Sequence, residues 1–150
     1  MVLVLSENDL NDVWRITWPP DLRGTHPVVG VATGDCHLTE ASYKRLVGST
    51  SNSWGWCLKS LKIYHDSDKY REGVPYPIRD IDIDDVYSFY MVLDMDRGSL
   101  AFQIDDDFLG EAFSGLCGKK LFPMVSAVYG HCEVTLTYVG NHFLGEKRTE

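Results

Sequence analysis

Apolar and polar side chains alternate along several short stretches of this chain, which is the pattern of half-buried β-strands. Trp14 to Trp18 alternates large apolar with polar residues, and Pro19 and Pro20 follow it. The prolines predict the end of that strand, because they cannot donate to a sheet ladder. Val28 to Thr33 is short and rich in β-branched residues, and its Gly30 indicates a bulge or a close backbone approach.

The clearest local unit is a predicted β-hairpin between residues 87 and 104. Tyr87 to Met95 alternates in polarity, and Asp96-Arg97-Gly98 follows as a turn. Leu100, Phe102 and Ile104 then repeat the apolar alternation. Two alternating segments joined by a short turn with glycine are typical of a hairpin.

Further strands are predicted at 53–56, 61–64, 121–129 and 133–139. Residues 40–47 fit either one helical turn or a loop, and 66–85 is interpreted as a long surface loop rich in Pro, Asp and Lys. Short strands with turn signals about every 8–12 residues predict an all-β fold, an antiparallel β-sandwich. A length of 150 residues suits one domain.

The composition is that of a folded protein with an acidic surface. Hydrophobic residues make up 44% and charged residues 24%, with a formal net charge of −8. A nucleic-acid or anionic membrane partner is not expected, because both need a basic surface. The charge therefore favours neutral or basic partners.

The cysteines predict a reduced, cytoplasmic protein. Cys36, Cys57, Cys117 and Cys132 form no Cys-x-x-Cys pair, and the apolar start Met1 to Leu5 is too short for a secretory signal. The sequence also has no apolar run of the roughly 18 residues that a membrane helix requires.

Acidic residues gather in predicted turns, where aspartate is favoured for backbone reasons. They are Asp80, Asp82, Asp84, Asp85 and Asp105 to Asp107. Read as an EF-hand loop from Asp80, the run would need glycine at the sixth and glutamate at the twelfth position. Asp85 and Met91 stand there, so a calcium loop is not predicted.

Few features of the sequence indicate an enzyme. Cys36-His37 and His131-Cys132 are adjacent pairs, and neighbouring strand residues point to opposite faces, so no metal site is predicted. No Gly-x-Ser-x-Gly elbow, Ser-x-x-Lys pair or glycine-rich phosphate loop is present. The chain is therefore expected to be a binding module without a cofactor. A carbohydrate-binding or hydrolytic β-sandwich that uses the acidic turns stays as an alternative.

The aromatic residues suggest where the core and a binding site lie. Trp14, Trp18, Trp54 and Trp56 lie on predicted strands and are expected to fill the space between two sheets. Tyr43 and Tyr129 instead lie at predicted loop edges, where a ring can pack on a ligand while its hydroxyl forms a hydrogen bond.

Several segments, in order from about Trp14 to Gly140, resemble the SPRY (B30.2) domain of the SPRY domain-containing SOCS box proteins. They are Arg23-Gly24-Thr25-His26-Pro27-Val28-Val29-Gly30-Val31-Ala32-Thr33, Tyr43-Lys44-Arg45-Leu46-Val47-Gly48, Ser53-Trp54-Gly55-Trp56, Leu93-Asp94-Met95-Asp96, Gly118-Lys119-Lys120-Leu121-Phe122-Pro123 and Val125-Ser126-Ala127-Val128-Tyr129-Gly130-His131-Cys132-Glu133-Val134.

This resemblance implies a bent β-sandwich that recognises substrates for a ubiquitin-ligase adaptor. Such domains bind short Asp-Ile-Asn-Asn-Asn-like peptides of a target protein, and a SOCS box recruits elongins and a cullin. The pocket residues with a counterpart here are Thr25, Tyr43, Val128, Tyr129 and Gly130. Consecutive asparagine side chains offer both donors and acceptors, which such hydroxyl and backbone groups can meet.

The chain departs from the family pattern in three places. Tyr129 replaces the usual tryptophan and resembles F-box-linked SPRY relatives, so an interaction domain with a different ligand is a second alternative. Residues 1–13 match none of the family's N-terminal strands, residues 14–140 form a partial SPRY domain, and 141–150 is a polar tail without a SOCS box. An N-terminally truncated fold is therefore expected. A fragment, an incomplete gene model, a recogniser without an effector and a non-functional copy all remain open.

Overall fold

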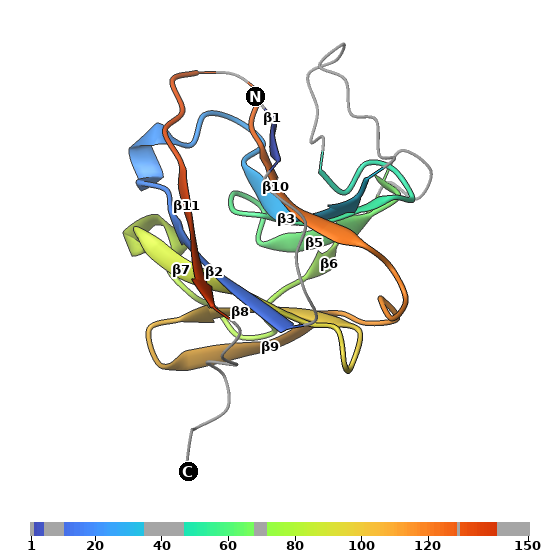
Figure 1. Ribbon diagram of the computed structural model, residues 1–150. Coiled ribbons are helices and arrows are strands. Elements are labelled where there is room, and N and C mark those ends of the chain that lie inside the picture. The colour runs from blue at the N-terminus through green and yellow to red at the C-terminus, as the bar shows by residue number, and fades with distance from the viewer. Residues whose placement is uncertain (1, 5–10, 35–46, 68–71, 129, 141–150) are drawn as a thin grey trace.

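A computed structural model describes residues 2–4, 11–34, 47–67, 72–128 and 130–140, which form two antiparallel sheets (Figure 1). The first has the order β1-β10-β3-β4-β5-β6, and the second β11-β2-β7-β8-β9. The strands are β1 (Val2–Val4), β2 (Asn11–Thr17), β3 (Val28–Thr33), β4 (Ser53–Cys57), β5 (Lys62–His65), β6 (Val74–Pro75), β7 (Ser88–Asp94), β8 (Ser99–Ile104), β9 (Asp107–Phe113), β10 (Leu121–Ser126) and β11 (Thr135–Gly140). Two 3-10 helices, η1 (Pro20–Leu22) and η2 (Ile83–Asp85), lie in the connections. The predicted antiparallel β-sandwich is confirmed.

The predicted hairpin is the β7–β8 pair. Leu93 faces Leu100 and Asp94 faces Ser99 across the turn. Phe89, Met91 and Leu93 are fully buried on the face that meets the other sheet. Their spacing of two positions matches the period at which strand side chains share a face.

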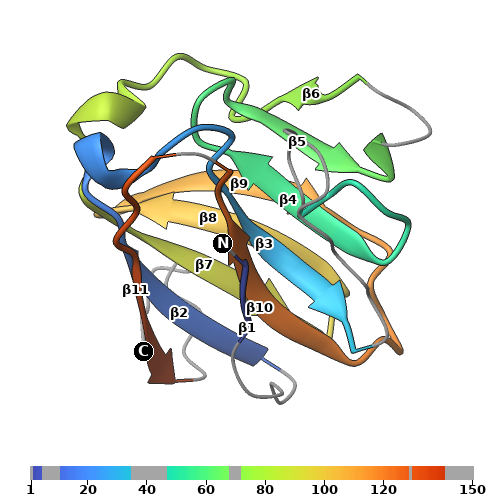
Figure 2. The same ribbon diagram turned by 90° about the horizontal axis from the view of Figure 1, so that it is seen from above.

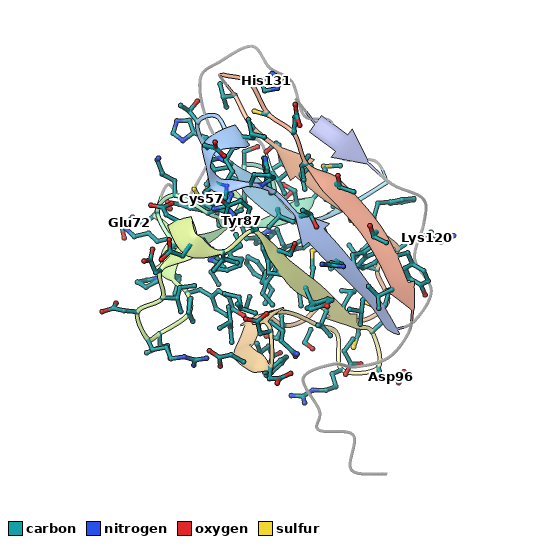
Figure 3. All side chains as sticks on the ribbon, turned by 90° about the vertical axis from the view of Figure 1, so that its left-hand side faces the viewer. Cys57, Glu72, Tyr87, Asp96, Lys120 and His131 are labelled. Atoms are coloured by element: carbon teal, nitrogen blue, oxygen red, sulfur yellow. The ribbon has the colours of Figure 1, made fainter. Side chains whose placement is uncertain are left out.

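The tryptophans fill the core, as the sequence predicts. Trp14, Trp18, Trp54 and Trp56 are 3%, 0%, 6% and 0% exposed. Trp56 is central, because its ring centroid lies 4.7 Å from that of Phe102 and 5.7 Å from that of Phe89. Side chains fill the space between the sheets (Figure 3), which is how two stacked sheets exclude water.

Gly30 lies where two backbones approach closely, one of the two roles expected of it. A Cβ atom at this position would lie 1.8 Å from the carbonyl oxygen of Trp54 on the neighbouring strand. Gly55, which faces Gly30, is crowded as well, with the carbonyl oxygen of Val47 2.9 Å from a hypothetical Cβ. Glycine at position 55 thus lets Val47 lie close against β4.

The interpretation of 66–85 as a surface loop is wrong for part of the segment. Tyr76 is 5% exposed and Ile83 6% exposed, and both belong to the main core. Two short elements, β6 and η2, interrupt the segment. The polar and prolyl composition hid these anchors, because single buried residues produce no periodic pattern.

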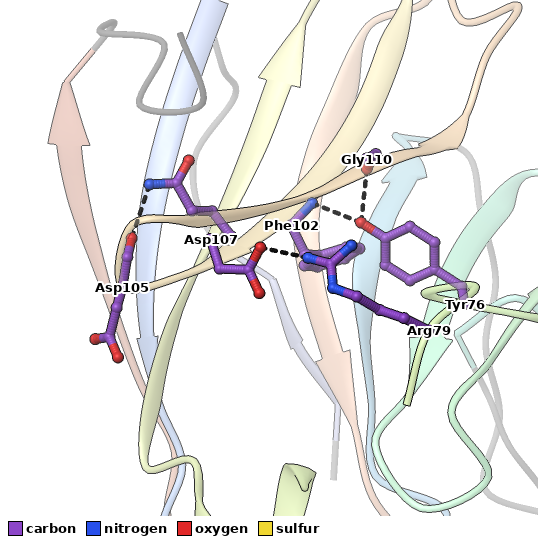
Figure 4. Close-up of polar contacts among 7 residues, drawn as sticks. Tyr76, Arg79, Phe102, Asp105, Asp107 and Gly110 are labelled. Carbon is purple, nitrogen blue, oxygen red and sulfur yellow. Dashed lines mark hydrogen bonds and ion pairs between the residues drawn. The ribbon is translucent and has the colours of Figure 1, made fainter. Parts of the chain in front are cut away.

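The Tyr76 hydroxyl bridges an irregular part of the β8–β9 ladder (Figure 4). It donates to the carbonyl oxygen of Gly110 at 2.7 Å and accepts from the backbone N–H of Phe102 at 3.1 Å. The register shifts on either side of Ala101, so β9 pairs with Gln103 but provides no partner for Phe102, which pairs with Met91 on the β7 side. Burial of the ring raises the pKa of the Tyr76 hydroxyl, which keeps it a proton donor.

Replacing Tyr76 with phenylalanine is expected to lower the free energy of unfolding by about 1–3 kcal/mol, because the buried N–H of Phe102 and the part-buried carbonyl oxygen of Gly110 lose their partner. Urea denaturation followed by fluorescence measures the change. Tyr87→Phe is the matched control, since Tyr87 is 60% exposed and should shift the value by less than about 0.5 kcal/mol. Equal stability of the two variants would show that the bridge contributes nothing.

Three strands go beyond the sequence prediction. Val2–Val4 pairs with the outer edge of β10, and Asn11–Thr17 forms a strand that begins before Trp14. β9 starts at Asp107, within the acidic run that was interpreted as a turn. Its strand character comes from pairing with β8 and not from a clear alternation of its own.

Candidate functional site

Three of the five predicted site residues lie together at one end of the sandwich. The backbone N–H of Val128 donates to the carbonyl oxygen of Thr25 at 2.9 Å. Gly130 lies against the same loop, because a Cβ there would be 3.3 Å from the Cα of Gly24. Tyr43 and Tyr129 are outside the described residues. We call the segments 22–27 and 128–133 the paired loops.

Backbone contacts continue along the paired loops. Arg23 and Cys132 form an antiparallel bridge, and the N–H of Glu133 donates to the carbonyl oxygen of Leu22 at 3.1 Å. Gly130 has a φ of 100°, a conformation that side chains disfavour. The backbone at Gly130 is therefore shaped by glycine and is not covered by a side chain of its own.

Arg23 fixes the first of the paired loops to the rest of the fold. Its side chain is 4% exposed and donates hydrogen bonds to the carbonyl oxygens of Trp18, Ile83 and Val86. Burial lowers the pKa of the guanidinium, and the charge of Asp84 partly opposes this shift. These three hydrogen bonds form the Arg23 clamp. It holds η1 and η2 side by side at the same end of the molecule (Figure 2).

The Thr25 hydroxyl is a buried polar group that the described residues leave unpaired. Its Oγ1 atom has no hydrogen-bond partner among them. A buried hydroxyl left unpaired costs about 1–3 kcal/mol, so most such groups in native proteins are satisfied. An unpaired buried hydroxyl therefore calls for an explanation in a native protein.

The rim of the paired loops carries an exposed hydrogen-bonded pair of side chains. His131 Nε2 lies 2.7 Å from Glu133 Oε2, and both side chains are more than half exposed. His131 lies at the outer end of the loop (Figure 3). An exposed pair of this kind adds little stability, since water screens it. The contacts at the centre of the paired loops are thus made by backbone groups, and the rim carries the side chains of His131 and Glu133.

The acidic residues lie at the surface, as expected of turn residues. Asp80, Asp82, Asp84, Asp85 and Asp105 to Asp107 are exposed. Arg79 pairs with Asp107 and holds the pKa of that carboxyl below its usual value (Figure 4). The neighbouring Asp85 carboxylate raises the pKa of Asp82, because it accepts a hydrogen bond from the protonated form and its negative charge opposes ionisation.

The predicted metal candidates do not form a cluster within the described part of the chain. No group of three His, Cys, Asp or Glu side chains there is arranged to hold an ion. Cys36 and His37 lie outside the described residues, whereas His131 is engaged with Glu133. No helix in the described segments is long and apolar enough to cross a membrane.

Sequence reasoning missed the residue that positions the loop. Arg23 was part of the recognised segment, but its burial and its three carbonyl partners were not anticipated. The signal available was weak: a lone arginine directly before Gly24 and Thr25. Its partners lie up to 63 residues away, and no local pattern reveals such contacts.

Comparison with known proteins identifies the same group of relatives as the resemblance seen in the sequence. The chain is 52% identical over 132 residues to protein gustavus of Drosophila melanogaster, covering 85% of this chain and 47% of that protein. It is 47% identical over 131 residues to human SPRY domain-containing SOCS box protein 1, again covering 85% and 47%. The chain thus spans about half the length of the curated relatives it matches. The resemblance to this group is confirmed.

The fold agrees with a solved structure at low sequence identity. The crystal structure of the SPRY domain of human HERC1 superposes with a TM-score of 0.60 at 15% identity, over 95% of this chain and 80% of that one. The family model described as the SPRY domain matches residues 13–140. This chain belongs to the SPRY domain family, whose members are typically protein-interaction modules.

Proposed function

We propose that the paired loops bind a short asparagine-containing peptide of a partner protein. The observation that carries the proposal is the convergence of Thr25, Val128 and Gly130, with the Thr25 hydroxyl buried and unpaired. An asparagine side chain supplies both a carbonyl acceptor and an NH₂ donor, and either can pair with a hydroxyl.

The structure around Val47 supports a contribution from Tyr43 to the same site. Val47 follows Tyr43 by four positions, and its N–H donates to the Oγ atom of Ser126 at 3.1 Å. Ser126 lies two positions before Val128 and ends β10. Val47 is therefore held by a residue that lies two positions before the second of the paired loops. We include Tyr43 and Tyr129 in the proposed peptide site.

The biological role that we propose is substrate recognition for a ubiquitin ligase. The relatives named SOCS box proteins suggest an adaptor in which this domain selects the target. Elongin and cullin partners would join through a SOCS box in a longer product. The proposed setting is the cytoplasm.

Replacing Thr25 with valine is expected to weaken binding of a fluorescent Asp-Ile-Asn-Asn-Asn peptide about tenfold, which corresponds to about 1.4 kcal/mol. Valine keeps the shape and removes only the hydroxyl. Because Oγ1 has no partner in the free protein, the variant should be as stable as the wild type or slightly more stable. Fluorescence anisotropy and thermal melting measure the two quantities.

Two controls make this test specific. Thr137→Val makes the same chemical change on the exposed side of β11 and should leave peptide binding intact. Asp106→Ala tests the carbohydrate-binding or hydrolytic alternative, because Asp106 lies in an exposed acidic turn away from the paired loops. A folded wild-type chain that fails to bind the peptide, or equal binding by wild type and Thr25→Val, would refute the proposed site.

A further inference from the structure

The outer face of the second sheet carries a row of buried apolar residues. Val13, Val92 and Ala101 are cross-strand partners on β2, β7 and β8, and they are 1%, 2% and 3% exposed. Their strand neighbours, such as Trp14 and Met91, point into the core between the sheets, so these three side chains point away from it. None of the three belongs to either hydrophobic cluster of the core. We call them the outer row.

No described element accounts for the burial of the outer row. The first sheet lies on the opposite face, and no described strand or 3-10 helix lies over this one (Figure 1). The cover is local, because Arg15 on the same face of β2 is exposed, and so is its partner Thr137 on β11. An uncovered face of an antiparallel sheet is in contact with water. The outer row therefore requires apolar side chains from another part of the chain.

The chain leaves β11 directly beside the outer row. Gly140, the last residue of β11, is the cross-strand partner of Val13. Its φ of 132° is a conformation that glycine adopts readily and other residues rarely do, and it lets the chain turn away from the strand direction. The outer row spans two strand spacings, about 10 Å, and four extended residues reach about 13 Å. Residues 141–144 are therefore long enough to cross from β2 to β8.

The sequence after Gly140 has the composition that such a cover requires. Phe143 and Leu144 are apolar, and they are followed by Gly145 and then by five polar residues, four of them charged. The connection at 5–10 is the other nearby candidate, but it must join β1 in the first sheet to β2 in the second. Its length is needed to span the distance of about 10 Å between stacked sheets.

We propose that residues 141–144 fold back over the outer face of the second sheet, where Phe143 and Leu144 cover the outer row. The segment after β11 is then a built-in cover for this face of the SPRY domain. Without it, the outer row would be an exposed apolar patch, the kind of surface to which other proteins bind or through which chains aggregate.

A buried acceptor beside the outer row supports a covering segment. Gln103 lies two positions from Ala101 on the same face of β8 and is 5% exposed. Its Nε2 donates to the carbonyl oxygen of Asp105 at 2.8 Å, but its Oε1 has no partner among the described residues. Leaving a buried acceptor unpaired is costly. A segment that crosses as far as β8 brings backbone N–H groups close to this oxygen.

Nuclear Overhauser spectra of the full chain test the proposal directly. Cross-peaks are expected from the ring protons of Phe143 to the methyl groups of the outer row, because such cross-peaks arise only between protons in close contact. Cross-peaks to these methyl groups from residues 5–10 instead would overturn the proposal. Their absence from every residue outside the second sheet would overturn it too.

Replacing Phe143 and Leu144 together with serine is expected to lower the melting temperature of the full chain by about 5 °C. The matched control replaces Ile78 and Tyr87 together with serine, because these are an aliphatic and an aromatic residue that are 99% and 60% exposed. The control should melt within about 2 °C of the wild type. Equal melting of the two double variants would rule out the cover. If the first variant does not fold, the wild-type spectra decide. Neither measurement uses a peptide, so the proposed peptide site and the cover stand or fall separately.

Discussion

Arg23→Met is expected to lower the free energy of unfolding by about 3–5 kcal/mol and to abolish peptide binding at the proposed site. The buried guanidinium is the shared donor for the carbonyl oxygens of Trp18, Ile83 and Val86. Methionine fills a similar volume but donates nothing, so these carbonyls lose their partner. With typical domain stabilities of about 5–15 kcal/mol, this is a large part of the total.

Arg23→Lys separates the effect of charge from that of geometry. A lysine keeps the positive charge but lacks the planar fork, so it cannot reach three separate carbonyls with the same orientation. We expect it to recover only part of the stability. Arg97→Met is the matched control, because Arg97 is exposed and its nearest carboxylate oxygen, on Glu111, is 3.8 Å away.

Urea denaturation and peptide anisotropy distinguish a positioning role from a purely structural one. If Arg23 positions Thr25, folded Arg23→Lys should bind peptide more weakly than the wild type even at low temperature, where both are fully folded. Unchanged binding by the folded lysine variant would show that the clamp serves stability alone. If Arg23→Met loses no more stability than Arg97→Met, the three hydrogen bonds of Arg23 do not stabilise the fold.

Gly30→Ala is expected to prevent folding of the sandwich. The added methyl would lie 1.8 Å from the Trp54 carbonyl oxygen and 2.8 Å from the Cα of Gly55. Both are backbone atoms in the middle of the β3–β4 ladder, so neither can rotate away as a side chain would. Relief would require the two strands to separate, which also disturbs Trp54 and Trp56 in the core.

Gly118→Ala is the control for this second prediction. Gly118 has a φ of 79° and nothing within 4 Å of a hypothetical Cβ. Alanine there should cost only the roughly 1–2 kcal/mol of a left-handed conformation. Circular dichroism and soluble yield compare the variants. A Gly30→Ala protein that melts as cooperatively as Gly118→Ala would mean that the strands are farther apart than described.

Much of the candidate site could be inferred from sequence only through family resemblance. Thr25 and Gly130 lie 105 positions apart, and neither has a local pattern that marks it as functional. Their proximity depends on β3 and β10 pairing as neighbours, with Val28 opposite Ser126. Strand order of this kind is decided by how apolar faces fit together, which a period-two pattern does not encode.

The local alternation of apolar and polar residues was sufficient to predict an element where the residues that carry the alternation also form that element. The alternation from Phe89 to Leu93 and the turn at Gly98 specify the β7–β8 hairpin, because a strand side chain's face follows from its position. The tryptophans likewise had to be buried, since no other arrangement removes so much apolar surface from water. The all-β class and the core were therefore determined by the sequence itself.

Only the tertiary structure decided what the irregular segments do. Tyr76 enters the core because the β8–β9 ladder leaves backbone groups that its hydroxyl can satisfy. Arg23 is buried because three carbonyls from distant segments meet around it. β11 ends the second sheet among the described strands, next to β2, a strand from the other end of the chain. In each case the cause is a partner distant in sequence, so the physical reason exists only once the chain has folded.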